Sequence, residues 1–390
     1  MSRLVMKFGG SSLATIDKIK AVAKIVSNRS ESVESIVVVV SAMGNTTNSM
    51  ISMSNEITQV PSKREMDVLM SAGEQMSIAY LTMALTELGV SSMSLTGAQA
   101  GIITYGNHSK SKISRINLKR IESSFNSYKV LVVAGFQGLN SRGDITTLGR
   151  GGSDISAVAL ACVLKSPVEI YTDVAGIYTV DPRIHPTARK LSSLSYSETM
   201  EMANLGASII EPRSVELAAK HQIPIHILLN TADTPGTIIK GDSDMLEENI
   251  ITNVSIMKEV VLINLNHTDL NVAQLFTQLA QEGVSVDVIS QTYEKDISFT
   301  ISKEDCAGAL KIIESLGEQE YRIKDDVSKV SIIGNAMRNQ PGVAADVFEV
   351  FANESIHFHQ VSTSEISISF IIDSDDTERT VKALAAAFNL

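Results

Sequence analysis

Residues Ile36-Val37-Val38-Val39-Val40 establish the class of fold for the first 240 residues. The run lacks any alternation of apolar and polar residues, which is typical of a parallel strand that is buried on both faces. Further apolar runs lie at Val5–Phe8, Val130–Ala134 and Val168–Tyr171. Between the runs, apolar residues recur at helical spacing, as in Ile16, Ile19, Ala23 and Val26. The pattern predicts an α/β fold with a mainly parallel sheet, helices on both faces, and ligands beyond the carboxyl ends of the strands.

Composition and charge exclude several classes of protein. The chain has 390 residues, 44% apolar and 20% charged, which is ordinary for a globular protein of two or three domains. Its net charge of −11 argues against general nucleic-acid binding, which requires a basic face. No apolar run suits a membrane helix or a secretory leader, so no membrane contact is expected. Cys162 and Cys306 lack metal-ligand spacing, and free thiols in a reducing compartment predict a cytoplasmic protein.

The C-terminal part of the sequence contains a repeat. After a polar connector at 241–256, an offset of 72 residues places Ala273 on Ala345 and Phe276 on Phe348. Each copy reads strand, helix, strand, strand, helix, which is typical of ferredoxin-like α+β modules, with chance similarity as the alternative. The predicted domains are 1–240, the connector 241–256, and modules at 257–326 and 327–390.

The segment Lys7-Phe8-Gly9-Gly10-Ser11-Ser12 leaves a predicted strand and enters a helix. Two glycines allow backbone N–H groups to approach a phosphate, and Lys7 can place a cation on a transferring phosphoryl group. The segment is no Walker P-loop. Taken alone, it is better explained as a structural Gly-Gly turn with a solvated lysine.

A second glycine-rich helix entrance, Leu148-Gly149-Arg150-Gly151-Gly152-Ser153-Asp154, carries an arginine. The planar guanidinium of Arg150 suits a bidentate contact with a carboxylate. A dinucleotide fingerprint is a weak alternative, because Asp154 stands where its third glycine should be. A tight loop capped by Ser153 or Asp154 is compatible with either interpretation.

A third loop, residues 171–183, follows another strand and contains two aspartates, two tyrosines and an arginine. Such a loop can hold the base and ribose of a nucleotide and help to organise its phosphates. Asp173, at the strand end, is the better placed carboxylate for Mg²⁺ or for orienting lysines. From composition alone, a solvated acidic turn is equally plausible.

Together these motifs resemble those of the aspartate kinases. Ser41-Ala42-Met43-Gly44, Ser71–Glu74 and Gly135–Gly138 join the three loops, in the order of that family, over essentially the whole chain. The resemblance implies an amino-acid kinase three-layer sandwich with a mainly parallel central sheet, followed by two ferredoxin-like ACT modules. It also implies transfer of the ATP γ-phosphoryl group to the β-carboxylate of L-aspartate, giving L-aspartyl-4-phosphate and ADP. This reaction is the first step of lysine, threonine and methionine biosynthesis.

The resemblance further implies roles for individual residues. Lys7 and Asp173 are the expected catalytic residues, and Mg²⁺ is expected to be held mainly by ATP, with no protein ligand assigned. The expected ATP-binding residues are Lys7, Gly9, Gly10, Ser11, Thr172, Asp173, Tyr178, Asp181, Pro182 and Arg183. The expected aspartate-binding residues are Ser41, Thr47, Glu74, Arg150, Gly151, Gly152, Ser153 and Asp154. By charge, Glu74 would pair with the ammonium group and Arg150 with a carboxylate.

Paired ACT modules imply inhibition by lysine or threonine and a homodimer formed through the modules. The second copy keeps the family's loop as Asn339-Gln340-Pro341-Gly342, whereas the first reads His267-Thr268-Asp269-Leu270, without proline or glycine. For the two modules, the alternative is a purely structural dimerisation unit. For the whole chain, the alternatives are another amino-acid kinase or a non-catalytic amino-acid sensor. The expected effector-binding residues are Asp269, Asp287, Gln291, Pro341, Gly342, Ser362, Thr363 and Glu365.

Overall fold

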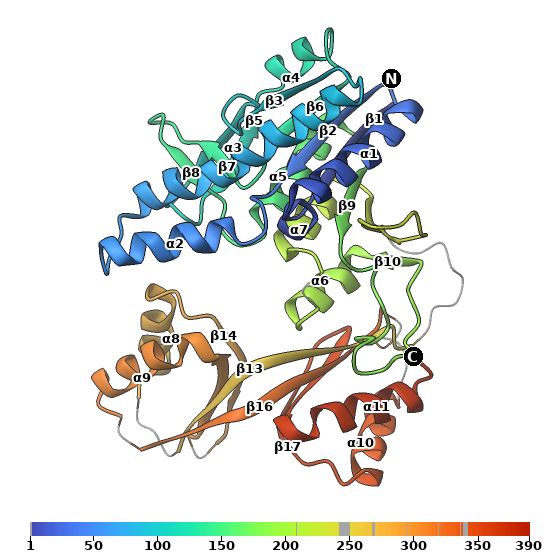
Figure 1. Ribbon diagram of the computed structural model, residues 1–390. Coiled ribbons are helices and arrows are strands. Elements are labelled where there is room, and N and C mark those ends of the chain that lie inside the picture. Colours follow the sequence, from blue (N-terminus) through green and yellow to red (C-terminus); the bar gives the residue numbers. More distant parts are fainter. Residues whose placement is uncertain are drawn as a thin grey trace. The chain divides into compact units, whose positions relative to one another are not determined.

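The computed structural model describes residues 2–207, 209–241, 250–266, 270–293, 295–318, 320–335, 337 and 342–390 (Figure 1). Among these residues the chain forms two compact units. Two short segments, Tyr178–Arg189 and Glu201–Ala207, belong to the second unit although the chain around them belongs to the first. Both segments lie within residues 1–240, which were expected to form a single domain.

An eight-stranded sheet forms the centre of the first unit, in the order β10-β12-β11-β9-β1-β2-β6-β3. All neighbouring strands pair in parallel except β11 and β12. The predicted strands are confirmed, and β2 is buried at all of its residues. The strands are β1 (Arg3–Phe8), β2 (Ser35–Val40), β3 (Ser92–Leu95), β6 (Val130–Ala134), β9 (Val168–Thr172), β10 (Ser193–Ser195), β11 (Ile225–Leu229) and β12 (Thr237–Lys240).

Helices cover both faces of this sheet (Figure 1). On one face α1 (Ile16–Ser32) and α3 (Lys63–Glu87) share an apolar core with Phe8. Because side chains alternate along a strand, Lys7 points to the opposite face, against which α5 (Gly152–Leu164) packs. The other helices are α2 (Thr46–Ile57), α4 (Lys119–Ser124), α6 (Tyr196–Asn204) and α7 (Pro212–His221), and a 3₁₀ turn spans Gly10–Leu13.

A four-stranded sheet of order β5-β4-β7-β8 was not predicted from the sequence. Its strands are β4 (Ile102–Tyr105), β5 (Lys112–Ile116), β7 (Gln137–Leu139) and β8 (Ile145–Thr147). The last strand ends immediately before the Leu148–Asp154 loop. This small sheet therefore determines where that loop begins.

The second unit contains a six-stranded antiparallel sheet of order β14-β15-β13-β16-β18-β17. The expected order of strands and helices in both copies is confirmed, and each pair of helices covers its own apolar core. The elements are β13 (Asn253–Leu265), α8 (Val272–Gln281), β14 (Val286–Gln291), β15 (Ile297–Ser302), α9 (Cys306–Ser315), β16 (Tyr321–Ile333), α10 (Val343–Asn353), β17 (Phe358–Thr363), β18 (Ser367–Asp373) and α11 (Thr377–Ala387).

The two modules share their central strands. Residues 260–265 of β13 pair with 321–327 of β16 in the first module, whereas 253–257 pair with 329–333 in the second. The second module is thus completed by a strand that precedes the first module in the sequence. Residues 253–256, expected to lie in a connector, are strand, because Ile251 and Val254 are buried in the core of the second module.

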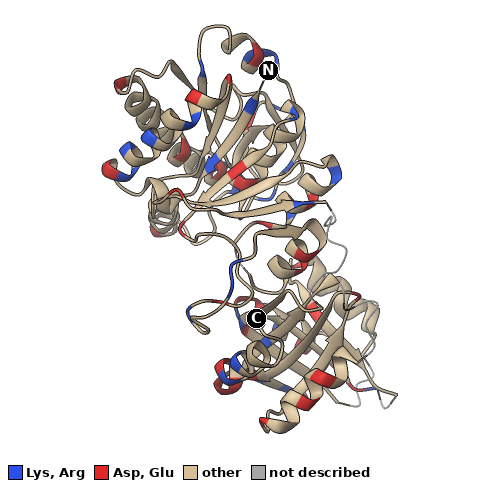
Figure 2. Cartoon of the chain, turned by 90° about the vertical axis from the view of Figure 1, so that its right-hand side faces the viewer, with Lys and Arg blue, Asp and Glu red and all other residues tan. Residues whose placement is uncertain are grey.

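The distribution of charged residues and the character of the helices relate to two expectations, that the chain binds neither nucleic acid nor membrane. Lys and Arg residues are interspersed with Asp and Glu in the chain (Figure 2). In the part of the chain that the structure describes, none of the helices combines the length and apolar character needed to cross a membrane.

Candidate active site

The Lys7–Ser12 loop lies where β1 ends, beside the loop that follows β2. Gly10 must be glycine here, because a Cβ would lie 2.7 Å from the carbonyl oxygen of Ala42. The Gly44 N–H donates to the carbonyl oxygen of Gly10 at 3.0 Å. The Lys7–Ser12 loop and the Ser41–Gly44 loop are therefore in direct contact.

The Leu148–Asp154 loop, which leads into α5, also contacts the Lys7–Ser12 loop. The Lys7 Nζ lies 2.6 Å from Asp154 Oδ1, and both side chains are nearly buried, with 12% and 13% exposed. Gly151, just before the helix, has a left-handed backbone with φ of 64°, which glycine adopts without strain. The Lys7 ammonium group is thus held at the N-terminus of α5, where anions are favoured.

A small cavity of about 280 Å³ opens beside this ion pair. Every residue of the expected aspartate-binding set lines it. The lining residues are Lys7, Gly10, Ser41, Ala42, Gly44, Thr47, Glu74, Phe136, Gly149, Arg150, Gly151, Gly152, Ser153 and Asp154. The cavity thus combines a carboxylate from α3, a guanidinium group and the N-terminus of α5.

Glu74 is the buried acid of the small cavity, with 3% of its surface exposed. Its Oε1 accepts a hydrogen bond from the Ala42 N–H at 3.0 Å, whereas its Oε2 has no hydrogen-bond partner among the described residues. Burial raises the pKa of Glu74 to about 7, although the Ala42 N–H partly opposes the shift. A buried, unpaired carboxylate oxygen that lines a cavity is well suited to receive a cationic group.

A large cavity of about 840 Å³ lies on the other side of the same loop. Ser11 and Ser12 line it, together with Asp173 and Asn230 at the ends of β9 and β11. The Asn230 amide donates to Ser12 Oγ at 2.6 Å, which ties the β11 end to the first loop. The Lys7–Ser12 loop therefore contributes to both cavities, with Lys7 and Gly10 on the small one and Ser11 and Ser12 on the large one.

The third predicted loop is divided between the two units. Thr172 and Asp173 belong to the first unit, where the Thr172 hydroxyl lies 3.1 Å from Asp173 Oδ1. Tyr178, Asp181, Pro182 and Arg183 belong to the second. There the Asn253 side chain donates to the Tyr178 carbonyl oxygen, and Arg183 pairs with Asp181 at 2.7 Å and lowers its pKa. These four residues therefore belong to the other compact unit from Lys7.

The expected effector-binding residues lie at several places in the second unit. Asp269 and Pro341 lie outside the described residues. Asp287 and Gln291 are on the edge strand β14, and Asp287 pairs with the buried Lys329 of β16. Ser362 and Thr363 are on the opposite edge strand β17, Glu365 follows that strand, and Gly342 precedes α10.

Residues at the site that are absent from the expected binding sets include Ala42, Gly44, Phe136, Gly149 and Glu211. Phe136 lines the small cavity, and Glu211 lies against Gly151, since a Cβ on that glycine would be 2.6 Å from the Glu211 carboxylate. Burial raises the pKa of Glu211, and the Asp154 charge adds to the shift. The one sequence signal for Glu211 was Pro212, because proline often occupies the first position of a helix and so places Glu211 at the N-terminus of one. No group of three or more His, Cys, Asp or Glu side chains suited to a metal occurs among the described residues.

Comparison with known proteins agrees with this geometry. Residues 2–229 match the amino acid kinase family, and residues 271–316 and 330–388 match the ACT domain. Aspartokinase of Geobacillus stearothermophilus is 42% identical over 398 residues, covering all of this chain and 98% of that protein. Aspartokinase 2 of Bacillus subtilis is 39% identical with the same coverage.

Solved structures extend the likeness to three dimensions. The chain superposes on E. coli aspartokinase III in complex with aspartate and ADP with a TM-score of 0.84, at 24% identity, over 99% of this chain and 100% of that one. Aspartate kinase from Synechocystis gives a TM-score of 0.58 at 35% identity, over 100% of this chain and 69% of that one. The first unit has the fold of the amino acid kinase family. This chain belongs to the aspartokinase family, with an amino acid kinase domain followed by ACT modules.

Proposed function

We propose that the chain transfers the γ-phosphoryl group of ATP to the β-carboxylate of L-aspartate, giving L-aspartyl-4-phosphate and ADP. The observation that carries this proposal is the charge pattern of the small cavity. Glu74 offers an unpaired carboxylate oxygen, and Arg150 and the α5 N-terminus offer positive potential. This pattern complements an amino acid that has one ammonium and two carboxylate groups.

The chemistry requires no general base. The attacking β-carboxylate is ionised at neutral pH, since its usual pKa is about 4. Catalysis therefore consists of holding two anions in line and compensating their charge. Lys7 is suited to that compensation because its ammonium group lies at the loop that borders both cavities, and Asp154 orients it at 2.6 Å.

In this proposal the nucleoside of ATP occupies the large cavity and its phosphates follow the Gly9–Ser11 backbone. The two glycines allow the main chain to approach phosphate oxygens closely. Mg²⁺ bound to the triphosphate would supply further positive charge. Asp173, which lines the large cavity, is the carboxylate we would expect nearest to that ion.

The decisive experiment is an ADP-release assay of the purified chain with a panel of amino acids. We expect turnover with L-aspartate and much less with glutamate, acetylglutamate or a nucleoside monophosphate. Preference for one of these other acceptors would support a different amino-acid kinase. No turnover with any of them would support the non-catalytic sensor.

The raised pKa of Glu74 leads to a prediction about pH. Below about 7 the carboxyl group of the free enzyme is protonated, and the substrate ammonium loses its charge partner. The KM for aspartate is expected to rise by about tenfold per pH unit as the pH falls below that value, and to level off above it. Steady-state kinetics from about pH 6 to about pH 8 measure the profile.

The matched control for this prediction is Glu74→Gln. It should give a high aspartate KM that does not vary with pH in that range, because the titrating group is gone. A wild-type profile that is equally flat would show that Glu74 does not bind the ammonium group.

For the second unit we propose feedback control by lysine, threonine or both, in a cytoplasmic homodimer assembled through the ACT modules. The support is the family, whose E. coli member aspartokinase III has been crystallised with lysine and aspartate. Isothermal titration with each amino acid, alone and together, tests the regulation, and heat with neither would favour a structural role. Sedimentation of the purified chain tests the dimer.

A further inference from the structure

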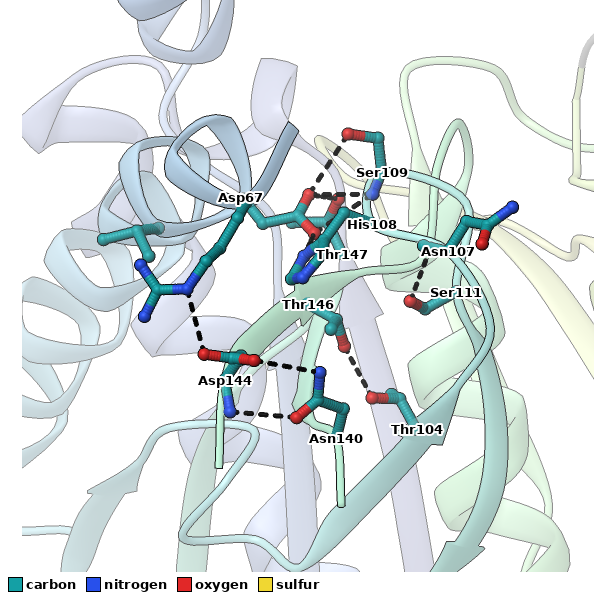
Figure 3. A network of polar contacts seen from close by, with 12 residues as sticks. Asp67, Thr104, Asn107, His108, Ser109, Ser111, Asn140, Asp144, Thr146 and Thr147 are labelled. Carbon is teal, nitrogen blue, oxygen red and sulfur yellow. Dashed lines mark hydrogen bonds and ion pairs between the residues drawn. The ribbon is translucent and has the colours of Figure 1, made fainter. Parts of the chain in front are cut away.

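Asp67, on α3, is the centre of a buried polar network that lies outside the lining of the small cavity (Figure 3). The residue is fully buried. Its Oδ1 accepts from the Thr147 hydroxyl at 2.6 Å, and the Ser109 N–H lies 3.0 Å from both carboxylate oxygens. The His108 Nδ1 lies 2.7 Å from Oδ2. One carboxylate thus joins α3, the end of β8 and the 108–111 loop.

The network supports the loop that carries Arg150. Thr147 is the last residue of β8 and stands three positions before Arg150. Its carbonyl oxygen accepts from the Ser111 N–H at 3.0 Å. The Ser109 carbonyl oxygen lies under Gly149, where a Cβ would be only 3.2 Å away. The start of the Arg150 loop therefore rests on two segments that Asp67 holds together.

Asp67 and Glu74 lie on the same side of one helix. They are seven residues apart, which is about two turns, or about 10.5 Å along the axis. The side of α3 that supplies the buried carboxylate of the small cavity therefore also supplies the anchor of the loop with the guanidinium group. An ion pair between Arg64 Nε and Asp144 Oδ1, 3.0 Å long, also ties the start of α3 to the residue just before β8.

We propose that Asp67 is a positioning residue that fixes the Arg150 loop at a set distance from Glu74 and thereby sets the length of acceptor that the site takes. The inference rests on the proposed function. Aspartate and glutamate differ by one methylene group, and a site that discriminates between them must have a rigid lining. If the hydrogen bonds of Asp67 are removed, we expect the Arg150 loop to move away from Glu74, so that the site accepts glutamate.

The test compares Thr147→Val with Thr147→Ser. Valine keeps the shape of the side chain but removes the hydroxyl that donates to Asp67, whereas serine keeps the hydroxyl. Thr104→Val is the matched control, because it removes a buried hydroxyl pair with Thr146, 2.5 Å long, in the same sheet without touching Asp67 (Figure 3). KM and kcat are measured for aspartate, glutamate and ATP.

For Thr147→Val we expect the aspartate KM to rise by about tenfold and the ratio of kcat/KM for aspartate over glutamate to fall by about tenfold. The KM for ATP should not change. Thr147→Ser and Thr104→Val should keep the wild-type ratio even if the melting temperature of either falls. Asp67→Asn should give a larger loss of selectivity wherever it folds.

An unchanged ratio in Thr147→Val would overturn the inference, as would an equal fall in Thr104→Val, which would indicate a general loss of stability. These outcomes leave the proposed function intact, because the wild-type chain would still phosphorylate aspartate. A wild-type chain that does not phosphorylate aspartate would instead refute the proposed function directly.

Discussion

Replacing Lys7 by methionine is expected to lower kcat for aspartate phosphorylation by about 10³-fold, because the variant lacks the cation that compensates charge on the transferring phosphoryl group. Methionine preserves most of the side-chain length, so the β1 packing around position 7 is retained. The KM for aspartate should change much less than kcat, since Glu74 and Arg150 remain. Steady-state kinetics with circular dichroism measure activity and folding on the same sample.

Two further variants separate catalysis from stability at this position. Lys7→Met leaves the nearly buried Asp154 without its ammonium partner, which costs folding free energy in its own right. The double variant with Asp154→Asn removes that cost and should recover stability but not kcat. Lys20→Ala, an exposed lysine on α1, should behave as wild type. Turnover close to wild type in Lys7→Met would show that Lys7 does not act on the phosphoryl group.

Replacing Arg150 by alanine is expected to raise the KM for aspartate by about 10- to 100-fold, with little change in the KM for ATP. The range corresponds to the loss of a charge-assisted hydrogen bond to a carboxylate, about 1.5–3 kcal/mol. Arg150 is exposed and lines only the small cavity of the two, so its loss should not unfold the protein. Initial rates over a range of aspartate concentrations at saturating ATP measure the effect.

The controls for Arg150 use the geometry of its side chain and of its loop. Arg150→Lys keeps the charge but not the bidentate fork, and it should give an intermediate KM. Arg142→Ala changes an exposed arginine in the β7–β8 turn, outside both cavities, and should be neutral. If Arg150→Ala had the wild-type KM, the carboxylates of the substrate would have to be bound by other groups.

The parallel sheet could be predicted because its signal is local. The unbroken apolar run at Val37–Val40 required burial on both faces, and parallel strands end at a common edge. Lys7 lies near the end of such a strand, and Ser41 and Asp173 each follow one, so their placement at the same edge of the sheet could be expected from the strand pattern. Glu74 lies in the middle of a helix, and only the family resemblance indicated that it belongs to the site. Its unpaired oxygen and raised pKa depend on burial that a linear pattern does not encode.

The division of the 171–183 loop could not be predicted from its composition. Val180 is buried with Ile251 and Val254 in the second unit, and this contact joins segments that are far apart in the sequence. The same limit applies to Glu211, which meets Gly151 through the α7–α5 packing. In each case the position depends on which distant residue is the partner, and a single sequence does not specify that partner.

The sharing of β13 and β16 has a consequence for how such chains can evolve. A break between residues 326 and 327 would cut β16 near its middle. A chain that begins at Met257 would lack residues 253–256 of β13, the strand that completes the second module. Neither half can therefore be lost, duplicated or recombined with another enzyme on its own. The two modules would have to be kept together, and because Val180 is buried in the core of the second module, a gene fusion that transferred them would also have to supply that contact.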